Sequence, residues 1–119
     1  MSNDAATIDS EDVNENLRII YIRGRLDIQG TDAIGTKFTV LSATDKHRVV
    51  VDLSDVDFLA SIGIRSLVTN AKAQQQRGGR MVLFVGENAP VAKVLKTTGI
   101  DTVLPMFADA AAAREAALA

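Results

Sequence analysis

The feature that most constrains the fold is a near-continuous apolar run within residues 48–53, formed by Val49-Val50-Val51 and Leu53. A run that does not alternate with polar residues is typical of a strand covered on both faces. Residues 80–85 repeat the pattern with Met81-Val82-Leu83-Phe84-Val85. Two such runs, separated by a stretch of helical periodicity, predict parallel strands with helices packed against the sheet. We expect residues 48–53 to form the central strand.

Helical spacing of apolar residues predicts helices between these strands. They begin near Thr31 (Ile34, Phe38, Leu41), near Ser61 (Ile64, Leu67, Val68, Ala71), at Ala89 (Val91, Val94, Leu95) and near Asp109, where an alanine-rich segment follows. Gly78-Gly79 and Gly99 end the second and third helices.

Further strands are predicted at residues 6–13, 17–22 with an extension to Asp27, and 102–106. The turn residues Asn14-Glu15-Asn16 make the first two a hairpin. The predicted order is β-β-α-β-α-β-α-β-α, an α/β sandwich with a mixed, mostly parallel sheet. We expect residues 1–5 to be a disordered tail and residues 6–119 to form a single domain.

Composition excludes several classes of function. The formal net charge is −2, so no general attraction to nucleic acid or to an anionic membrane is expected. There is no cysteine, and no apolar run approaches the roughly 20 residues of a membrane-spanning helix. The acidic start, residues 1–12, lacks the features of a signal peptide. These observations predict a cytoplasmic protein.

Residues that carry catalysis or bind metals are sparse. His47 is the only histidine and lies between Lys46 and Arg48, which is typical of a solvated loop. Asp52, Asp55 and Asp57 surround a strand end, but a turn separates them and gives a metal triad no fixed geometry. No phosphate-binding loop or dinucleotide fingerprint is present. We predict no catalytic residues, no metal and no cofactor.

Ser61 is the residue singled out by position. It lies where a helix start needs an N-cap, and serine is among the best N-capping residues. If Ile64, Leu67, Val68 and Ala71 are buried, steps of 100° place Ile62, Arg65 and Thr69 on the opposite, solvent side. An exposed aliphatic beside an arginine suits a protein contact, although single exposed aliphatics are common.

Two stretches of the chain resemble a known signature. Asp52-Leu53-Ser54, Val56 and Phe58, followed by Ser61-Ile62-Gly63-Ile64, resemble the pattern D-L-S-x-V-x-F-x-x-S-x-G-I/L of STAS-domain anti-sigma-factor antagonists. Gly24-Arg25-Leu26-Asp27 resembles the G-x-L-D segment of that family, and residues 78–83 resemble its G-G-x-hydrophobic strand entry. The resemblance covers residues 13 to 108 and implies a STAS-like sandwich.

The resemblance also implies a function. In such proteins the serine that matches Ser61 is phosphorylated by an anti-sigma factor of the GHKL serine kinase type, and a PPM-type serine phosphatase reverses the modification. In that family the unphosphorylated protein binds the anti-sigma factor and the phosphorylated form releases it. The resemblance therefore implies a partner-switching protein in transcription regulation and not an enzyme. Many family members carry aspartate before this serine, whereas Ala60 stands here, and Ile62 replaces a second small residue.

The partner-binding residues predicted from this reading are Asp27, Ile62, Gly63, Arg65 and Thr69. Asp27 also suits a second role, as a carboxylate that caps a helix start or a turn. Two alternatives stay open. One is a STAS scaffold subunit of a stress-signalling or lipid-transport assembly, and the other is a small-ligand or nucleotide-binding STAS module.

Overall fold

The computed structural model describes residues 6–45 and 48–119. Its strands are β1 (Thr7–Asp12), β2 (Leu17–Leu26), β3 (Arg48–Leu59), β4 (Arg80–Phe84) and β5 (Met106–Phe107). Its helices are α1 (Ile28–Ser42), α2 (Ser61–Gln76), α3 (Ala89–Thr97) and α4 (Ala110–Leu118), with a 3-10 turn, η1 (Ile100–Thr102), before β5. The predicted order of strands and helices is confirmed. The predicted disordered tail, residues 1–5, and His47 lie outside the described residues.

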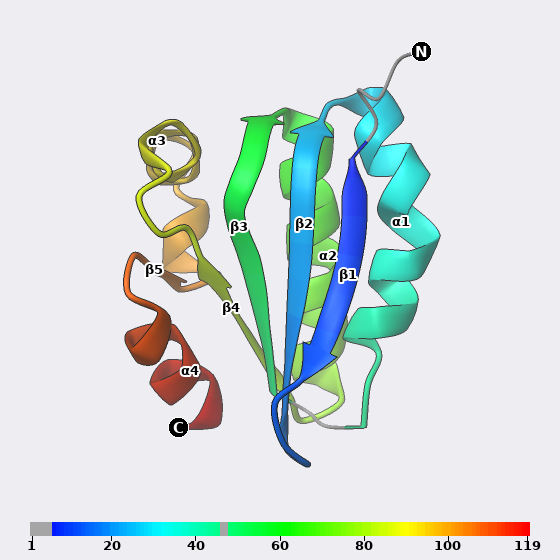
Figure 1. Cartoon of the computed structure of the whole chain (residues 1–119), viewed down its shortest axis with the longest axis vertical. Coiled ribbons are helices and arrows are strands. Elements are labelled where there is room, and N and C mark those ends of the chain that lie inside the picture. The colour runs from blue at the N-terminus through cyan, green and yellow to red at the C-terminus, as the bar shows by residue number, and fades with distance from the viewer. Residues whose placement is uncertain (1–5, 46–47) are drawn as a thin grey trace.

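The strands form one sheet in the order β1-β2-β3-β4-β5 (Figure 1). β1 is antiparallel to β2, and each later pair of neighbours is parallel. The central position predicted for β3 is therefore confirmed. Val49, Val51 and Leu53 are 0% exposed, because helices cover the face of the sheet to which they point.

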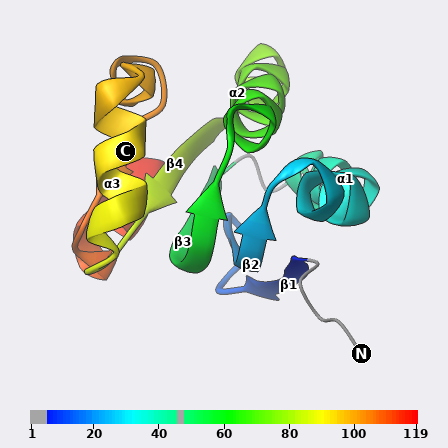
Figure 2. The same cartoon turned by 90° about the horizontal axis from the view of Figure 1, so that it is seen from above.

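The core is divided by the sheet into two clusters. On one face, Ile20, Ile22, Val51 and Leu83 pack with buried side chains of α1, α2 and α3, among them Phe38, Leu67 and Leu95. Figure 2 shows α1 and α2 side by side over this face. On the other face, Ala113 and Ala117 of α4 pack against Leu17, Ile19, Val50 and Val82.

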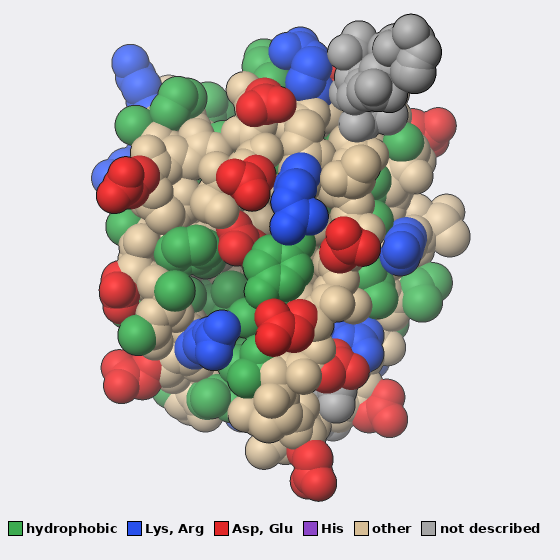
Figure 3. Space-filling model, viewed as in Figure 1, with side chains coloured by type: hydrophobic (Ala, Val, Ile, Leu, Met, Phe, Trp, Pro, Cys, Tyr) green, Lys and Arg blue, Asp and Glu red, His purple; other side chains and the backbone are tan. Residues whose placement is uncertain are grey.

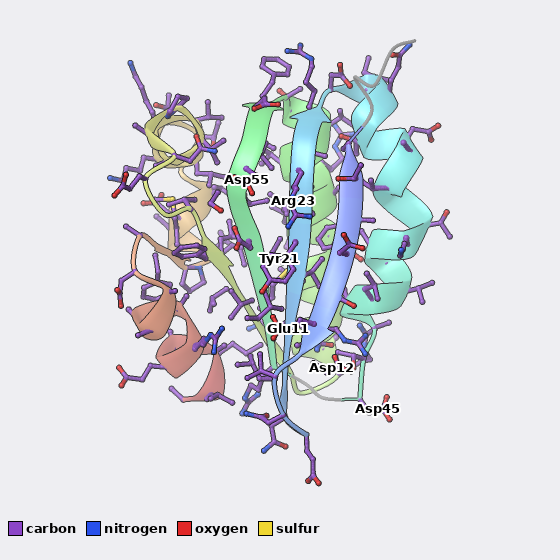
Figure 4. All side chains as sticks on the ribbon, in the orientation of Figure 1. Glu11, Asp12, Tyr21, Arg23, Asp45 and Asp55 are labelled. Atoms are coloured by element: carbon purple, nitrogen blue, oxygen red, sulfur yellow. The ribbon has the colours of Figure 1, made fainter. Side chains whose placement is uncertain are left out.

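The part of the second face that lies over β1, β2 and β3 carries charged and polar side chains that pair with one another. Tyr21 donates a hydrogen bond to Glu11 at 2.7 Å, and Arg23 lies 3.5 Å from both Asp9 and Asp55. Figure 4 shows Tyr21, Arg23, Glu11 and Asp55 projecting from these strands, and Figure 3 shows acidic, basic and apolar side chains mixed on this face. The hydrogen bond that Tyr21 donates to Glu11 raises the pKa of Tyr21, and partial burial raises it further.

Three predicted boundaries were wrong. α1 begins at Ile28 instead of near Thr31, because Asp27 caps it. β3 continues past Leu53 to Leu59, because its second half pairs with Arg23–Leu26 of β2. The last strand is Met106–Phe107 and not residues 102–106, because Gly99 at φ 75° leads into the 3-10 turn over Ile100–Thr102.

The buried face of α2 differs from the predicted one. Leu67 is fully buried as expected, but Ile64, Val68 and Ala71 are only partly buried. The fully buried positions are Gly63, Leu67, Asn70 and Gln74. α2 is therefore rotated about its axis relative to the prediction, so that Gly63 faces the sheet. Asn70 is accommodated because its side chain donates to the Ser66 carbonyl at 2.9 Å.

Candidate functional site

Ser61 lies at the carboxyl end of β3, at the first position of α2. The backbone N–H of Ala60 donates to the Leu26 carbonyl at 3.0 Å, which ties this connection to the end of β2. Ser61 is exposed, and within the described residues its hydroxyl has no hydrogen-bond partner. The hydroxyl is thus free to meet a second molecule.

The prediction that Ser61 is the N-cap was wrong by one residue. Ala60 occupies the N-cap position with extended backbone (φ −88°, ψ 169°) and no side-chain cap. The Ile64 N–H bonds to the Ala60 carbonyl at 3.1 Å, whereas the N–H groups of the first turn, which precede it, have no intrahelical acceptor. The helix start next to Ser61 therefore presents unneutralised N–H dipoles, which favour an anion.

Gly63 is buried, unlike the other residues predicted to contact a partner. A Cβ on Gly63 would lie 2.9 Å from Leu26 Cβ and 2.9 Å from Leu59 Cδ1. Glycine here lets α2 approach the ends of β2 and β3 closely. Gly63 therefore packs against the core, and this contact determines the position of Ser61 at the start of α2.

Ile62, Arg65 and Thr69 are exposed and lie together along a groove between α1 and α2. The groove has a volume of about 720 Å³, and α1 contributes Ile28 and Val40 to it. These two side chains are 72% and 64% exposed, and Ile62 is 38% exposed. A groove that has exposed aliphatic side chains, with Arg65 and Asp32 among its polar lining residues, suits a protein contact. Ser61 lies directly before Ile62 of this groove in the chain.

Asp27 performs the capping role that its sequence position suggested. Its Oδ1 accepts from the Gly30 N–H at 2.8 Å, and its Oδ2 lies 3.5 Å from Arg25 Nε. The hydrogen bond from Gly30 is the main reason why the pKa of Asp27 lies below its ordinary value of 3.8, and Arg25 lowers it further. Asp27 is half-buried at the start of α1, next to Ile28 of the groove.

The predicted contacts did not include Ile28, Val40 or Phe58. Ile28 and Val40 were missed because the predicted helix began three residues too late and its outer face was not analysed. Arg25 and Phe58 form a stacked pair, with the guanidinium 4.5 Å from the ring centroid. Their strand register, Arg25 opposite Phe58, required the continuation of β3 beyond Leu53.

The aspartates considered for a metal triad are separated by their own contacts. Asp52 Oδ1 accepts from the Ser54 N–H at 2.9 Å and from the Ser54 hydroxyl at 2.6 Å, while Asp55 lies 3.5 Å from Arg23. In the part of the chain that the structure describes, no group of three or more acidic, histidine or cysteine side chains could hold a metal ion. Across the same residues, no helix is long and apolar enough to cross a membrane.

Comparison with known proteins gives a family match and several matching folds. A family model described as "STAS domain" matches residues 10–113. An anti-sigma factor antagonist from Mycobacterium paratuberculosis superposes with a TM-score of 0.85 at 22% identity, over 99% of this chain and 98% of that chain. A STAS-domain anti-sigma-factor antagonist from Planctomyces limnophilus gives 0.79 at 24% identity, over 94% and 98%.

A third structure, the Bacillus cell fate determinant SpoIIAA in its phosphorylated form, gives a TM-score of 0.63 at 17% identity, over 84% of this chain and 90% of that chain. At these identities the similarity shows a shared fold.

Proposed function

The chain belongs to the STAS-domain family, and we propose that it is an anti-sigma-factor antagonist whose partner binding is controlled by phosphorylation of Ser61. The observation that carries this proposal is the exposed, unbonded Ser61 hydroxyl at the start of α2, directly before a groove with an apolar rim. Similar folds named anti-sigma-factor antagonists support the assignment, and one of them is described in a phosphorylated form.

The unmodified protein binds an anti-sigma factor of the GHKL serine kinase type through the groove between α1 and α2. Ile28 and Ile62 supply apolar surface, while Arg65 and Thr69 supply polar contacts along its side. Asp27, at the start of α1, contacts the partner with the carboxylate oxygen that does not cap the helix. An anti-sigma factor held in this way does not hold its sigma factor.

Phosphorylation transfers the γ-phosphoryl group of ATP, held by the partner kinase, to Ser61. The Ser61 Oγ forms a bond to the γ-phosphorus, the bond between that phosphorus and the bridging oxygen of ADP breaks, and the hydroxyl proton is released to a base of the kinase. ADP leaves. A PPM-type phosphatase adds water across the Oγ–phosphorus bond and restores the hydroxyl with release of inorganic phosphate. This chain supplies the acceptor and no catalytic group.

The phosphate separates the complex because it places about −1.5 to −2 charges and new bulk beside the contact surface. A charge that is enclosed at an interface without a matched cation makes the free energy of binding less favourable by several kcal/mol. A loss of that size turns tight binding into weak binding. Within the free domain the same phosphate meets the unbonded N–H groups at the start of α2, where the helix dipole favours an anion. Binding is therefore lost while the fold is kept.

Incubation with candidate GHKL kinases and ATP, followed by mass-spectrometric site mapping, tests the acceptor directly. We expect one phosphate on Ser61 in the wild type and none in Ser61→Ala. Ser10→Ala, at an exposed position of β1 that does not line the groove, is the matched control and should be phosphorylated like the wild type. Phosphate found in Ser61→Ala at the wild-type level would refute the assignment of Ser61.

A further inference from the structure

We propose a second ligand site in this protein, a pocket for a phosphate group at the end of the sheet opposite to Ser61. The pocket lies where β3 and β4 begin and α2 ends, and its volume is about 320 Å³. Three cationic residues line it: Arg48 and Arg80, the first residues of β3 and β4, and Lys72 of α2. The site is independent of the switch at Ser61, which follows the last residue of β3.

The charges of this pocket are unbalanced, although the chain as a whole has a formal net charge of −2. Arg48 and Arg80 are direct partners across neighbouring parallel strands, so their backbones are about 4.8 Å apart. Like charges placed opposite each other across strands repel. No Asp or Glu side chain lines the pocket, and among the described residues no carboxylate pairs with Arg48, Lys72 or Arg80.

The arginines elsewhere on the sheet differ in this respect. Arg18, Arg23 and Arg25 each have an aspartate within 3.5 Å. Ala119 reaches the rim of the pocket, but its carboxylate forms no ion pair with the three cations. Among the described residues, no Asp or Glu side chain therefore offsets the three cationic residues that line this pocket.

The number and type of cations favour a phosphate over a carboxylate. Two arginine forks and an ammonium group match the several oxygens and the double charge of a phosphate, whereas one carboxylate would leave most of the positive charge uncompensated. The volume is at the lower end of the range for ligand pockets, which limits the ligand to inorganic phosphate or a small phosphomonoester.

One wall of the pocket is apolar and fixed. It is formed by Val103, Leu104 and Pro105, and Leu104 is 1% exposed. The Leu83 N–H of β4 donates to the Pro105 carbonyl at 2.8 Å, which holds this wall against the sheet. Leu104 is buried, so the apolar group of a small phosphomonoester would contact Val103 and Pro105 of this wall while its phosphate binds the cations.

Titration of the full chain with inorganic phosphate and with phenyl phosphate, at matched ionic strength in sodium chloride, tests the site. Calorimetry should give saturable binding, and amide resonances near Arg48, Gly79 and Arg80 should shift. Tighter binding of phenyl phosphate than of inorganic phosphate would show that the site prefers a phosphomonoester. Equal binding of the two would show that the site recognises the phosphate group alone.

The double variant Arg48→Gln with Arg80→Gln removes two charge-assisted contacts and should weaken binding about a hundredfold, or tenfold for each contact. Its matched control, Lys37→Gln with Lys93→Gln, removes the same charge from exposed positions on α1 and α3 and should bind like the wild type.

Without phosphate, the arginine double variant should melt no lower than the wild type, since a like-charge pair is relieved. If it fails to fold, Lys72→Gln on exposed α2 surface should still weaken binding about tenfold. No saturable binding, or equal binding by all variants, would overturn the proposal.

Discussion

Removing the Ser61 hydroxyl takes away no hydrogen bond within the described residues, because Ala60 is the N-cap of α2 and Ser61 is exposed at the next position. Ser61→Ala should therefore change the free energy of unfolding by less than about 0.5 kcal/mol. Ser61→Asp should raise it by about 0.3–1 kcal/mol, because a carboxylate in the first turn interacts favourably with the helix dipole. Urea unfolding of both variants measures this. A loss of about 1 kcal/mol in Ser61→Ala would show that the serine caps the helix after all.

Two substitutions distinguish the capping hydrogen bond of the Asp27 side chain from the effect of its negative charge. Asp27→Ala removes the acceptor of the Gly30 N–H and should lower the thermal midpoint, whereas Asp27→Asn keeps an acceptor and should retain most of the stability at neutral pH. If Asp27 contacts the anti-sigma factor through its charge, Asp27→Asn should also bind that partner more weakly. Normal binding by Asp27→Asn would limit the residue to capping.

The pH dependence of the Asp27 contribution follows from the direction of its pKa shift. The pKa is lower in the folded protein than the ordinary value of 3.8, so the charged form is favoured by folding. The contribution is complete above the unfolded pKa and is lost as the pH falls through the folded pKa. The stability difference between wild type and Asp27→Asn should therefore shrink in acid below about pH 4. A difference that stays constant down to pH 2 would contradict the shift.

Two positions hold α2 against the rest of the core, and one should be sensitive to removed volume and the other to added volume. Leu67→Ala should cost about 2–5 kcal/mol, because the side chain is 0% exposed and its loss leaves a cavity. Gly63→Ala should cost about 1–3 kcal/mol, since the new methyl meets Leu26 and Leu59 at 2.9 Å. Gly35→Ala on α1 is the control: no atom lies within 4 Å, and the change should stabilise by about 0.5–1 kcal/mol. Stabilisation by Gly63→Ala would show that α2 is not tightly seated there.

The groove between α1 and α2 should matter for binding and not for folding. Arg65→Ala should change the free energy of unfolding by less than about 0.5 kcal/mol yet weaken binding to the anti-sigma factor. Ile28→Ser with Ile62→Ser should do the same, while Val103→Ser, at an exposed apolar position outside the groove, should bind normally. Calorimetric titration against the partner distinguishes these outcomes. If the groove variants bind as the wild type does, the contact face lies elsewhere.

At the scale of elements, the periodicity of apolar residues predicted the identity and order of the strands and helices but not their ends. β3 was cut short because Ser54, Asp55 and Asp57 lack strand-like patterning, and their pairing with β2 is a tertiary effect. The rotation of α2 about its own axis could not be predicted from its apolar residues, because the close approach of Gly63 to Leu26 and Leu59 determines it. The exposure of Ile62, Arg65 and Thr69 was nevertheless predicted correctly.

At the scale of the whole molecule, the two ends of the sheet differ in chemistry. Ser61, Asp27 and the groove lie at the carboxyl ends of β2 and β3, whereas the cations Arg48 and Arg80 lie at the amino ends of β3 and β4. The sequence motif and the helical periodicity pointed to Ser61, Ile62 and Arg65, which are close in the chain, whereas Ile28 and Val40 of the groove were missed. The pocket at the amino ends depends on strand register and on Lys72 of α2, which no local pattern joins to the strands.

Control of partner binding by phosphorylation of Ser61 is tested most directly by a calorimetric titration with the anti-sigma kinase. It compares wild type, Ser61→Ala, Ser61→Asp and wild type phosphorylated with ATP, each shown to be folded by its thermal melt. Wild type and Ser61→Ala should bind alike. Ser61→Asp and the phosphorylated protein should bind at least tenfold more weakly, a loss of about 1.4 kcal/mol or more. Equal binding by all four would contradict the claim.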